Sequence, residues 1–247
     1  MNLLKFILSR FLPSSKRKKI DPASYPKPGV DYGTLNGWQK MAMDNILSAC
    51  QLGGAGVDIP QLSQAEFDMV ITHICMHFGN EGMCKNIALK RQNTAVINLA
   101  VYEQVKAGKA ELDALIDETV ARMYEGSNEY KLRQIADYIA KAGKYNAGSN
   151  DPLDLLNGGG MCGAYAMLFY KMATRLGLQA YICYGYASNG TFTGAHAWNK
   201  VELPEGVRYY DVTFYDGAVR SRKWLGNVDG WGRVCSVNDK SSLRKRG

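Results

Sequence analysis

The sequence contains no pair of cysteines at C-x-x-C spacing, although six cysteines are spread along its 247 residues. Six cysteines in a chain of this length do not make a disulfide-dense composition. We expect most of them to be buried as small hydrophobic residues, which fits a reducing compartment. Cysteine usage therefore favours a cytoplasmic protein, with membrane association or export without an obvious signal peptide as the alternative.

The N-terminal stretch MNLLKFILSRFLPSSKRKK lacks an uninterrupted apolar run, because Lys5 and Arg10 divide it. It is too short and too charged to span a bilayer, and it has no small-residue cleavage site of a signal peptide. Two interpretations stay open. Residues 1–20 form an amphipathic helix that contacts a membrane surface peripherally, or they form a solvated terminus or a short helix packed on the body. The second interpretation is favoured.

The body of the chain also lacks an excess of positive charge, although the net charge of the whole chain is +7. Residues 1–20 contribute six positive charges and residues 240–247 contribute four, so the rest carries a net charge of −3. A groove that follows phosphates needs a basic face on the folded body. The charge pattern therefore predicts no nucleic-acid partner.

The order of the expected elements is typical of an α+β fold. Capping and periodicity predict helices first, followed by three strand-like runs separated by the turn signals SNG and LPEG. The expected helices cover 37–51, a segment from the Ser63–Glu66 capping box to about Phe78, 86–107, 110–124, 128–143 and 162–176, and the strands cover 179–187, 192–202 and 207–214.

Four regions follow from this order. A basic amphipathic N-terminus and a Pro/Gly-rich arm occupy residues 1–36, and a helical lead-in occupies 37–125. A region of helices followed by strands is expected at 126–238 and a basic tail at 239–247.

The stretch GGGMCGAYAMLFYKMATRLG places Cys162 at the start of a helix, directly after three glycines. The thiolate is the nucleophilic form of cysteine, and a helix N-terminus lowers the pKa of a thiol. Glycines allow a substrate backbone to approach closely. Cys162 is therefore a candidate nucleophile, with a buried structural cysteine as the alternative.

A nucleophilic cysteine needs a base, and the chain has only three histidines: His73, His77 and His196. His196 lies in the strand-like run FTGAHAWNKVE, and Asp211 lies in the next run. If LPEG closes a loop of two or four residues, both side chains share one face of the hairpin, directly or diagonally opposed. A carboxylate in that position orients an imidazole and stabilises its charge. Taken alone, His196 could instead be a histidine of the core, and Asp211 could instead be a solvated acid near a turn.

From about Leu132 to Asp216 the chain resembles the transglutaminase-like superfamily, which has a papain-like fold. The matching motifs are the residues at 160–166, GMCGAYA, at 196–201, HAWNKV, and at 210–213, YDVT. The resemblance implies a catalytic core at 126–238, in which a helix that carries the cysteine packs on an antiparallel sheet. It also implies that Cys162 is the nucleophile, His196 the base and later the acid, and Asp211 the orienting group.

The resemblance implies further site residues without deciding between them. The second oxyanion donor, beside the backbone N–H of the cysteine, is Tyr145 or Asn157. Trp198 shapes the acyl channel or packs in the core, and packing is slightly favoured. No metal or organic cofactor is implied.

A competing motif, THICMHFGNEGMC, places His73 and His77 on one helical face, with Cys84 as a third candidate zinc ligand. It lacks the glutamate of the metalloprotease motif and a clear fourth ligand. We predict no metal site here.

The residues together predict cysteine-dependent acyl chemistry on a protein or peptide amide, through a thioester at Cys162. Hydrolysis by a protease, peptidase or deamidase is expected. The alternatives are amine transfer by a protein-glutamine transglutaminase and a non-catalytic binding or scaffold module of the same fold.

Overall fold

The computed structural model describes residues 18–25, 30–188, 193–217, 221–228 and 235–237. Residues 1–17 and 238–247 lie outside these ranges, so the predicted amphipathic N-terminus and basic tail lie outside the described residues. Across the described part of the chain, no helix is long and apolar enough to cross a bilayer.

The lead-in, residues 37–125, combines helices with a small antiparallel sheet of strand order β1-β3-β2. Its helices α2 and α3 both begin with capping boxes, and the box predicted at Ser63 and Glu66 is confirmed. Its elements are α2 (Gly37–Leu52), β1 (Gly56–Asp58), α3 (Gln64–Phe78), α4 (Gly82–Asn86), β2 (Ile87–Lys90), β3 (Thr94–Ile97) and α5 (Leu99–Val120).

The prediction of two separate helices at 86–107 and 110–124 is wrong. The first part of that stretch forms the hairpin β2–β3, in which Arg91 and Gln92 take left-handed backbone conformations with φ of 55° and 63°. The remainder is the single helix α5, which continues through Gly108. A glycine in a helix costs about 1 kcal/mol relative to alanine, and the packing of α5 against both parts of the molecule offsets it.

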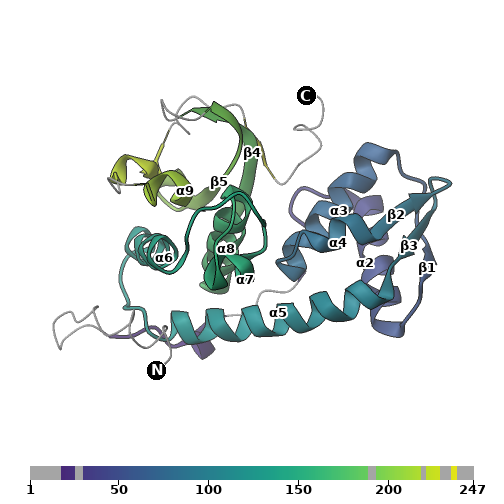
Figure 1. Cartoon of the computed structure of the whole chain (residues 1–247), viewed down its shortest axis with the longest axis horizontal. Helices are drawn as coiled ribbons and strands as arrows, with labels where there is room; N and C mark the ends of the chain where they lie inside the picture. The colour runs from purple at the N-terminus through teal and green to yellow at the C-terminus, as the bar shows by residue number, and fades with distance from the viewer. Residues whose placement is uncertain (1–17, 26–29, 189–192, 218–220, 229–234, 238–247) are drawn as a thin grey trace.

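The C-terminal part of the chain builds a five-stranded antiparallel sheet of order β7-β6-β5-β4-β8. Helix α8 packs on this sheet, and α6 and α7 lie beside α8 (Figure 1). The elements are α6 (Asn128–Ala142), α7 (Pro152–Asn157), α8 (Cys162–Arg175), β4 (Gln179–Ser188), β5 (Thr193–Leu203), β6 (Gly206–Tyr210), α9 (Val212–Tyr215), the 3₁₀ helix η2 (Arg222–Trp224), β7 (Leu225–Asn227) and β8 (Cys235–Val237). A second 3₁₀ helix, η1 (Pro22–Ser24), precedes the lead-in. The predicted α+β class is confirmed.

Two hydrophobic clusters meet along α5, which runs beneath both parts of the molecule in Figure 1. Tyr102 and Val105, near its start, belong to the cluster of the lead-in. Leu112, Ile116 and Val120 belong to the cluster that contains α8 and the large sheet. The clusters thus divide within α5, and the domain boundaries themselves stay a prediction.

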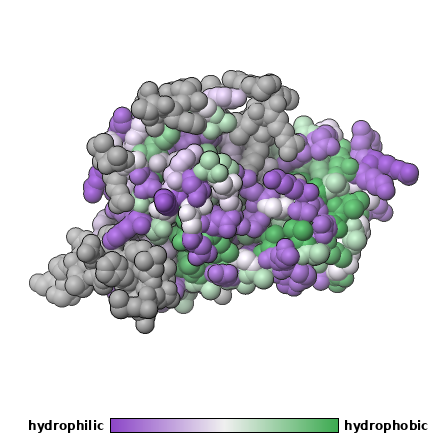
Figure 2. Space-filling view, in the orientation of Figure 1, coloured by the Kyte–Doolittle hydropathy of each residue, from purple (hydrophilic) through white to green (hydrophobic). Residues whose placement is uncertain are grey.

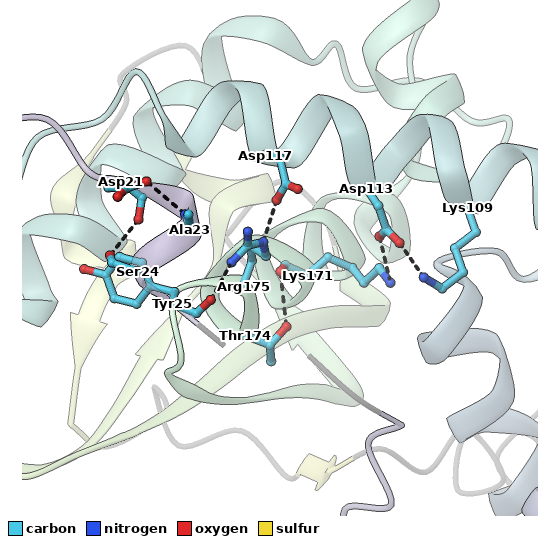
Figure 3. A network of polar contacts seen from close by, with 10 residues as sticks. All are labelled: Asp21, Ala23, Ser24, Tyr25, Lys109, Asp113, Asp117, Lys171, Thr174 and Arg175. Carbon is cyan, nitrogen blue, oxygen red and sulfur yellow. Dashed lines mark hydrogen bonds and ion pairs between the residues drawn. The ribbon is translucent and has the colours of Figure 1, made fainter. Parts of the chain in front are cut away.

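Paired charges tie α5 to the C-terminal half of α8 (Figure 3). Asp117 on α5 pairs with Arg175, whose side chain is only 8% exposed. Nζ of Lys171 lies 3.6 Å from Oδ1 of Asp113 and donates a hydrogen bond to the backbone oxygen of His77. Because α8 carries Cys162 at its other end, these contacts help to fix the candidate nucleophile relative to the lead-in.

Cys50 and Cys183 are buried thiols, as expected of small hydrophobic residues, and Cys162 is a partly exposed thiol. Cys75 differs, because it is disulfide-bonded. A disulfide is uncommon in a reducing compartment, so the cytoplasmic location stays a prediction.

Most of the face seen in Figure 2 is hydrophilic, and hydrophobic residues show mainly over the lead-in. The large apolar side chains that are exposed in this region are Trp38, Met41, Leu52 and Val96.

Candidate active site

Cys162 is held at the first turn of α8 by the chain segment that precedes α7. Tyr145 and Gly160 form a parallel bridge, and the N–H of Met161 donates to the backbone oxygen of Ser149 at 2.7 Å. Gly159 has a φ of 130°, and a Cβ there would lie 2.7 Å from the oxygen of Lys144. The glycines before Cys162 therefore let the chain pass close to its own backbone.

The glycine after Cys162 has a similar role. A Cβ on Gly163 would lie 2.4 Å from Oδ1 of Asn150. Only a residue without a side chain lets Asn150 pack directly against the start of α8, one residue from the candidate nucleophile.

The hairpin β5–β6 brings His196 and Asp211 together. Its loop has two residues, since Leu203 pairs with Gly206, and the register continues to Asn199 opposite Tyr210. Continued by one pair, this register sets Asp211 opposite Trp198, diagonal to His196 on the same face. Nε2 of His196 lies 2.9 Å from Oδ2 of Asp211, and both side chains are buried.

The run predicted as a strand at 207–214 ends as a strand at Tyr210, because Asp211 begins a short helix. Its Oδ1 accepts a hydrogen bond from the backbone N–H of Phe214 and caps α9. Asp211 thus uses one oxygen for the helix and the other for His196. An acid that caps a helix and holds a histidine has little freedom to move.

The imidazole of His196 is stabilised in its charged form. Burial alone lowers its pKa, but Asp211 and a hydrogen bond with Cys162 outweigh this effect and raise the pKa to about 9. Since Nε2 faces Asp211, Nδ1 is the nitrogen left to face the thiol. The three residues therefore form one connected set, in the order thiol, imidazole, carboxylate.

Aromatic rings hold the imidazole in place. Phe214 stacks on His196 with ring centroids 4.4 Å apart, and Trp198 lies at 6.1 Å. Asn199, which is fully buried, donates from Nδ2 to the backbone oxygens of Ala166 and Tyr181. The bond to Ala166 connects β5 to α8, and so connects the strand of His196 to the helix of Cys162, while the bond to Tyr181 connects β5 to β4.

Cys162 and His196 both line a pocket of about 300 Å³. The described residues that line it are Glu81, Asn150, Met161, Cys162, Gly163, Tyr184, Ala195, His196 and Ala197. Glu81 comes from the lead-in, at the N-terminal end of α4. The lead-in therefore forms part of the wall of this pocket.

The other three predicted site residues are not among the described residues that line this pocket. Tyr145 is half exposed, and burial together with the charge of Cys162 raises the pKa of its hydroxyl. Asn157 ends α7 and is not among the described lining residues. Trp198 is buried behind His196, as packing requires. A role for any of these three in catalysis stays a prediction.

Sequence reasoning missed Glu81 and Asn150. Asn150 lies in the predicted loop NAGSNDP, whose position just before the cysteine helix is a usable signal. Glu81 lies far from Cys162, His196 and Asp211 in sequence and carries no motif, so only its hydrogen bond with Asn150 in the folded chain reveals it.

His73 and His77 do not form a metal centre with other described residues. Nδ1 of His73 lies 2.9 Å from the backbone oxygen of Met69. Across the described part of the chain, no group of three or more His, Cys, Asp or Glu side chains is arranged to hold a metal ion.

Residues 117–214 match the family described as the transglutaminase-like superfamily. This segment is similar to a transglutaminase-like core. It contains Cys162, His196 and Asp211, together with the helix α8 and the strands that position them. The match covers less than half of the chain, and the lead-in lies mostly outside it.

Two solved structures resemble part of this chain at low similarity. One is a proposed cysteine protease from Cytophaga hutchinsonii, with 18% identity and a TM-score of 0.40, over 53% of this chain and 43% of that chain. Another is described as a TGase, with 16% identity and a TM-score of 0.35, over 58% of this chain and 49% of that chain. This chain thus spans less than half of either protein, and TM-scores of this size carry no functional argument. Among curated proteins, no sequence match was found.

Proposed function

We propose that the protein is a cysteine-dependent enzyme that hydrolyses amide bonds of proteins or peptides through a thioester at Cys162. One observation carries the proposal: the buried His196–Asp211 pair, 2.9 Å apart, contacts the thiol of Cys162 at the wall of a pocket. A paired imidazole beside a thiol is the arrangement that activates a cysteine nucleophile.

In the first step, the thiolate of Cys162 attacks the carbonyl carbon of the amide. As the C–N bond breaks, His196 gives its proton to the leaving nitrogen, and an acyl thioester remains. Asp211 keeps the imidazole oriented and compensates its charge. The developing oxyanion is stabilised by the backbone N–H of Cys162, since the first N–H groups of a helix have no intrahelical acceptor. We propose the hydroxyl of Tyr145 as the second donor.

In the second step, His196 removes a proton from water, and the resulting hydroxide attacks the thioester. The C–S bond breaks, the carboxylic acid leaves, and the thiolate–imidazolium pair is restored. An amine in place of water would complete the reaction of a transglutaminase instead.

The pH dependence of Cys162 alkylation tests the proposal. Wild type, His196→Ala and His77→Ala are treated with iodoacetamide between about pH 5 and 9, and mass spectrometry locates the label. We expect Cys162 to react selectively near pH 6 in wild type and in the His77 control. Loss of the imidazolium should slow the reaction at that pH by about a hundredfold, because the thiolate loses the neighbouring positive charge that stabilises it.

Two results would contradict the proposal. If Cys162 is inert, or reacts no faster than the other cysteines, a binding or scaffold module becomes the better interpretation. If His196→Ala leaves the low-pH reaction unchanged, the imidazole does not activate the thiol.

A further inference from the structure

We propose that a second cavity, where the lead-in meets the C-terminal end of α8, binds a free aliphatic amino acid in its zwitterionic form. The proposal does not depend on the proposed function, because the described residues that line this cavity are all different from those that line the pocket of Cys162. It assigns a ligand to charged side chains that the reaction at Cys162 does not use.

The cavity has a volume of about 240 Å³ and lies where three helices meet. Met76 and His77 line it from the end of α3, and further side chains come from α5 and from the last turns of α8. Asp31, from the segment before α2, completes the described lining. Pockets for drug-sized ligands measure about 300–1,000 Å³, so this cavity suits a smaller metabolite.

The walls of the cavity carry charges of both signs in equal number. Figure 3 shows side chains from α5 and α8 that point toward one another across this region. An anion would meet three carboxylates and a cation would meet three basic groups, whereas a zwitterion can place each of its charges beside opposite ones. The acids and bases of the described lining are Asp31, Asp113, Asp117, Lys109, Lys171 and Arg175.

Two lysines form a basic end of the cavity. Lys109 and Lys171 both pair with the single carboxylate of Asp113, so these three side chains together carry a net positive charge. Both lysines face the imidazole of His77, because burial and the charges of the two lysines lower the pKa of this imidazole to about 4.

Lys171 has a donor left for a ligand. Its side chain is only 12% exposed. One N–H donates to the backbone oxygen of His77, and Asp113 lies at 3.6 Å. An ammonium has three N–H donors, so at least one of them can donate to a carboxylate bound in the cavity.

Asp31 forms an acidic end. Its two oxygens accept hydrogen bonds from neutral donors, the backbone N–H of Gly33 and the hydroxyl of Tyr170. Among the described residues, no basic side chain forms an ion pair with it. An ammonium can therefore pair with this carboxylate. The apolar side chains of Met76 and Ile116, which also line the cavity, suit an aliphatic side chain of the ligand.

Matched probes test the proposal on the wild-type chain. L-Leucine, N-acetyl-L-leucine and L-leucinamide share one side chain, and the two analogues lack the ammonium and the carboxylate, respectively. Protein labelled with histidine is titrated by NMR at neutral pH, because His77 lines this cavity and His196 lines the pocket of Cys162. We expect leucine to shift the signals of His77 and to leave those of His196 unchanged. Each analogue should bind about tenfold more weakly, because it loses one charge-assisted interaction.

Two variants assign the ends of the cavity. In Asp31→Asn, leucine should lose its advantage over N-acetyl-leucine and keep its advantage over leucinamide. Lys171→Met should give the opposite pattern. The matched control is Lys106→Met, which removes an exposed lysine of α5 and should leave both ratios as in wild type. If a variant does not fold, the order of the three probes on wild type still decides.

Three results would overturn the proposal. Leucine leaves the signals of His77 in place at every concentration up to its solubility limit, or an analogue that lacks one charge binds as tightly as leucine. In the third case, leucine shifts His196 instead, and the ligand then enters the pocket of Cys162. None of these results bears on the alkylation of Cys162, so the proposed function is judged separately.

Discussion

Three side chains that are distant in sequence illustrate what can be predicted at the scale of single residues. Cys162, His196 and Asp211 were expected together because a helix start and two consecutive strands carry them in order, and the structure places them in contact. Glu81 and Asn150 could not be predicted in this way. Their place in the pocket depends on how α4 packs against the loop before α7, which no local pattern encodes.

His196 should titrate in a higher pH range than His73 and His77. Burial lowers the pKa of His73, and burial with nearby Lys109 and Lys171 lowers that of His77 to about 4. Asp211 and Cys162 overcome burial and raise that of His196 to about 9. NMR of histidine-labelled protein should therefore show one imidazole that stays protonated up to about pH 9 and two that lose their protons below pH 6.5.

Variants assign these signals. Asp211→Asn should lower the high titration, because burial then dominates, and His77→Gln should remove the titration near pH 4. Three titrations between pH 6 and 7 would show that His196 is not paired with a carboxylate.

At the scale of elements, the hairpins were predictable where turn residues separate long strand-like runs, as LPEG does between β5 and β6. The hairpin β2–β3 was not predicted, because short apolar runs such as IALK fit a helix or a strand equally. The end of β6 was also misplaced. It depends on Asp211 capping α9, a contact that competes with continuation of the strand.

The contact between α5 and α8 should depend on charge pairing. Asp117→Asn leaves Arg175 buried without its carboxylate, and we expect a loss of about 1–3 kcal/mol in the free energy of unfolding, measured with urea. The matched control is Glu118→Gln on the same helix, whose pair with Arg122 is largely exposed. That change should cost less than about 0.5 kcal/mol. Equal losses for the two variants would contradict a structural role for the buried pair.

At the scale of the whole molecule, α5 completes the core that contains α8 and the large sheet. Three residues of α5 and one residue just after it belong to that core, and each is at most 5% exposed. They are Leu112, Ile116 and Val120 in α5, and Met123. Burying side chains of this size stabilises a fold by about 2 kcal/mol each. Their sum is comparable with the total stability of a typical domain, about 5–15 kcal/mol.

A fragment of residues 126–247 should therefore not fold cooperatively, although it includes the whole predicted core. A fragment of residues 99–247, which retains α5, should show a cooperative thermal transition by circular dichroism. If the shorter fragment unfolds as cooperatively as the longer one, the predicted boundary at residue 126 marks an independent domain after all.

The double use of Asp211 also has a consequence for the order in which the protein becomes reactive. A chain is synthesised from its N-terminus, so the ribosome releases Cys162 well before it releases the hairpin and α9. Until α9 has formed, the carboxylate that holds His196 is not fixed. Under the proposed function, the thiol of Cys162 is therefore activated only after the hairpin β5–β6 and α9 have formed.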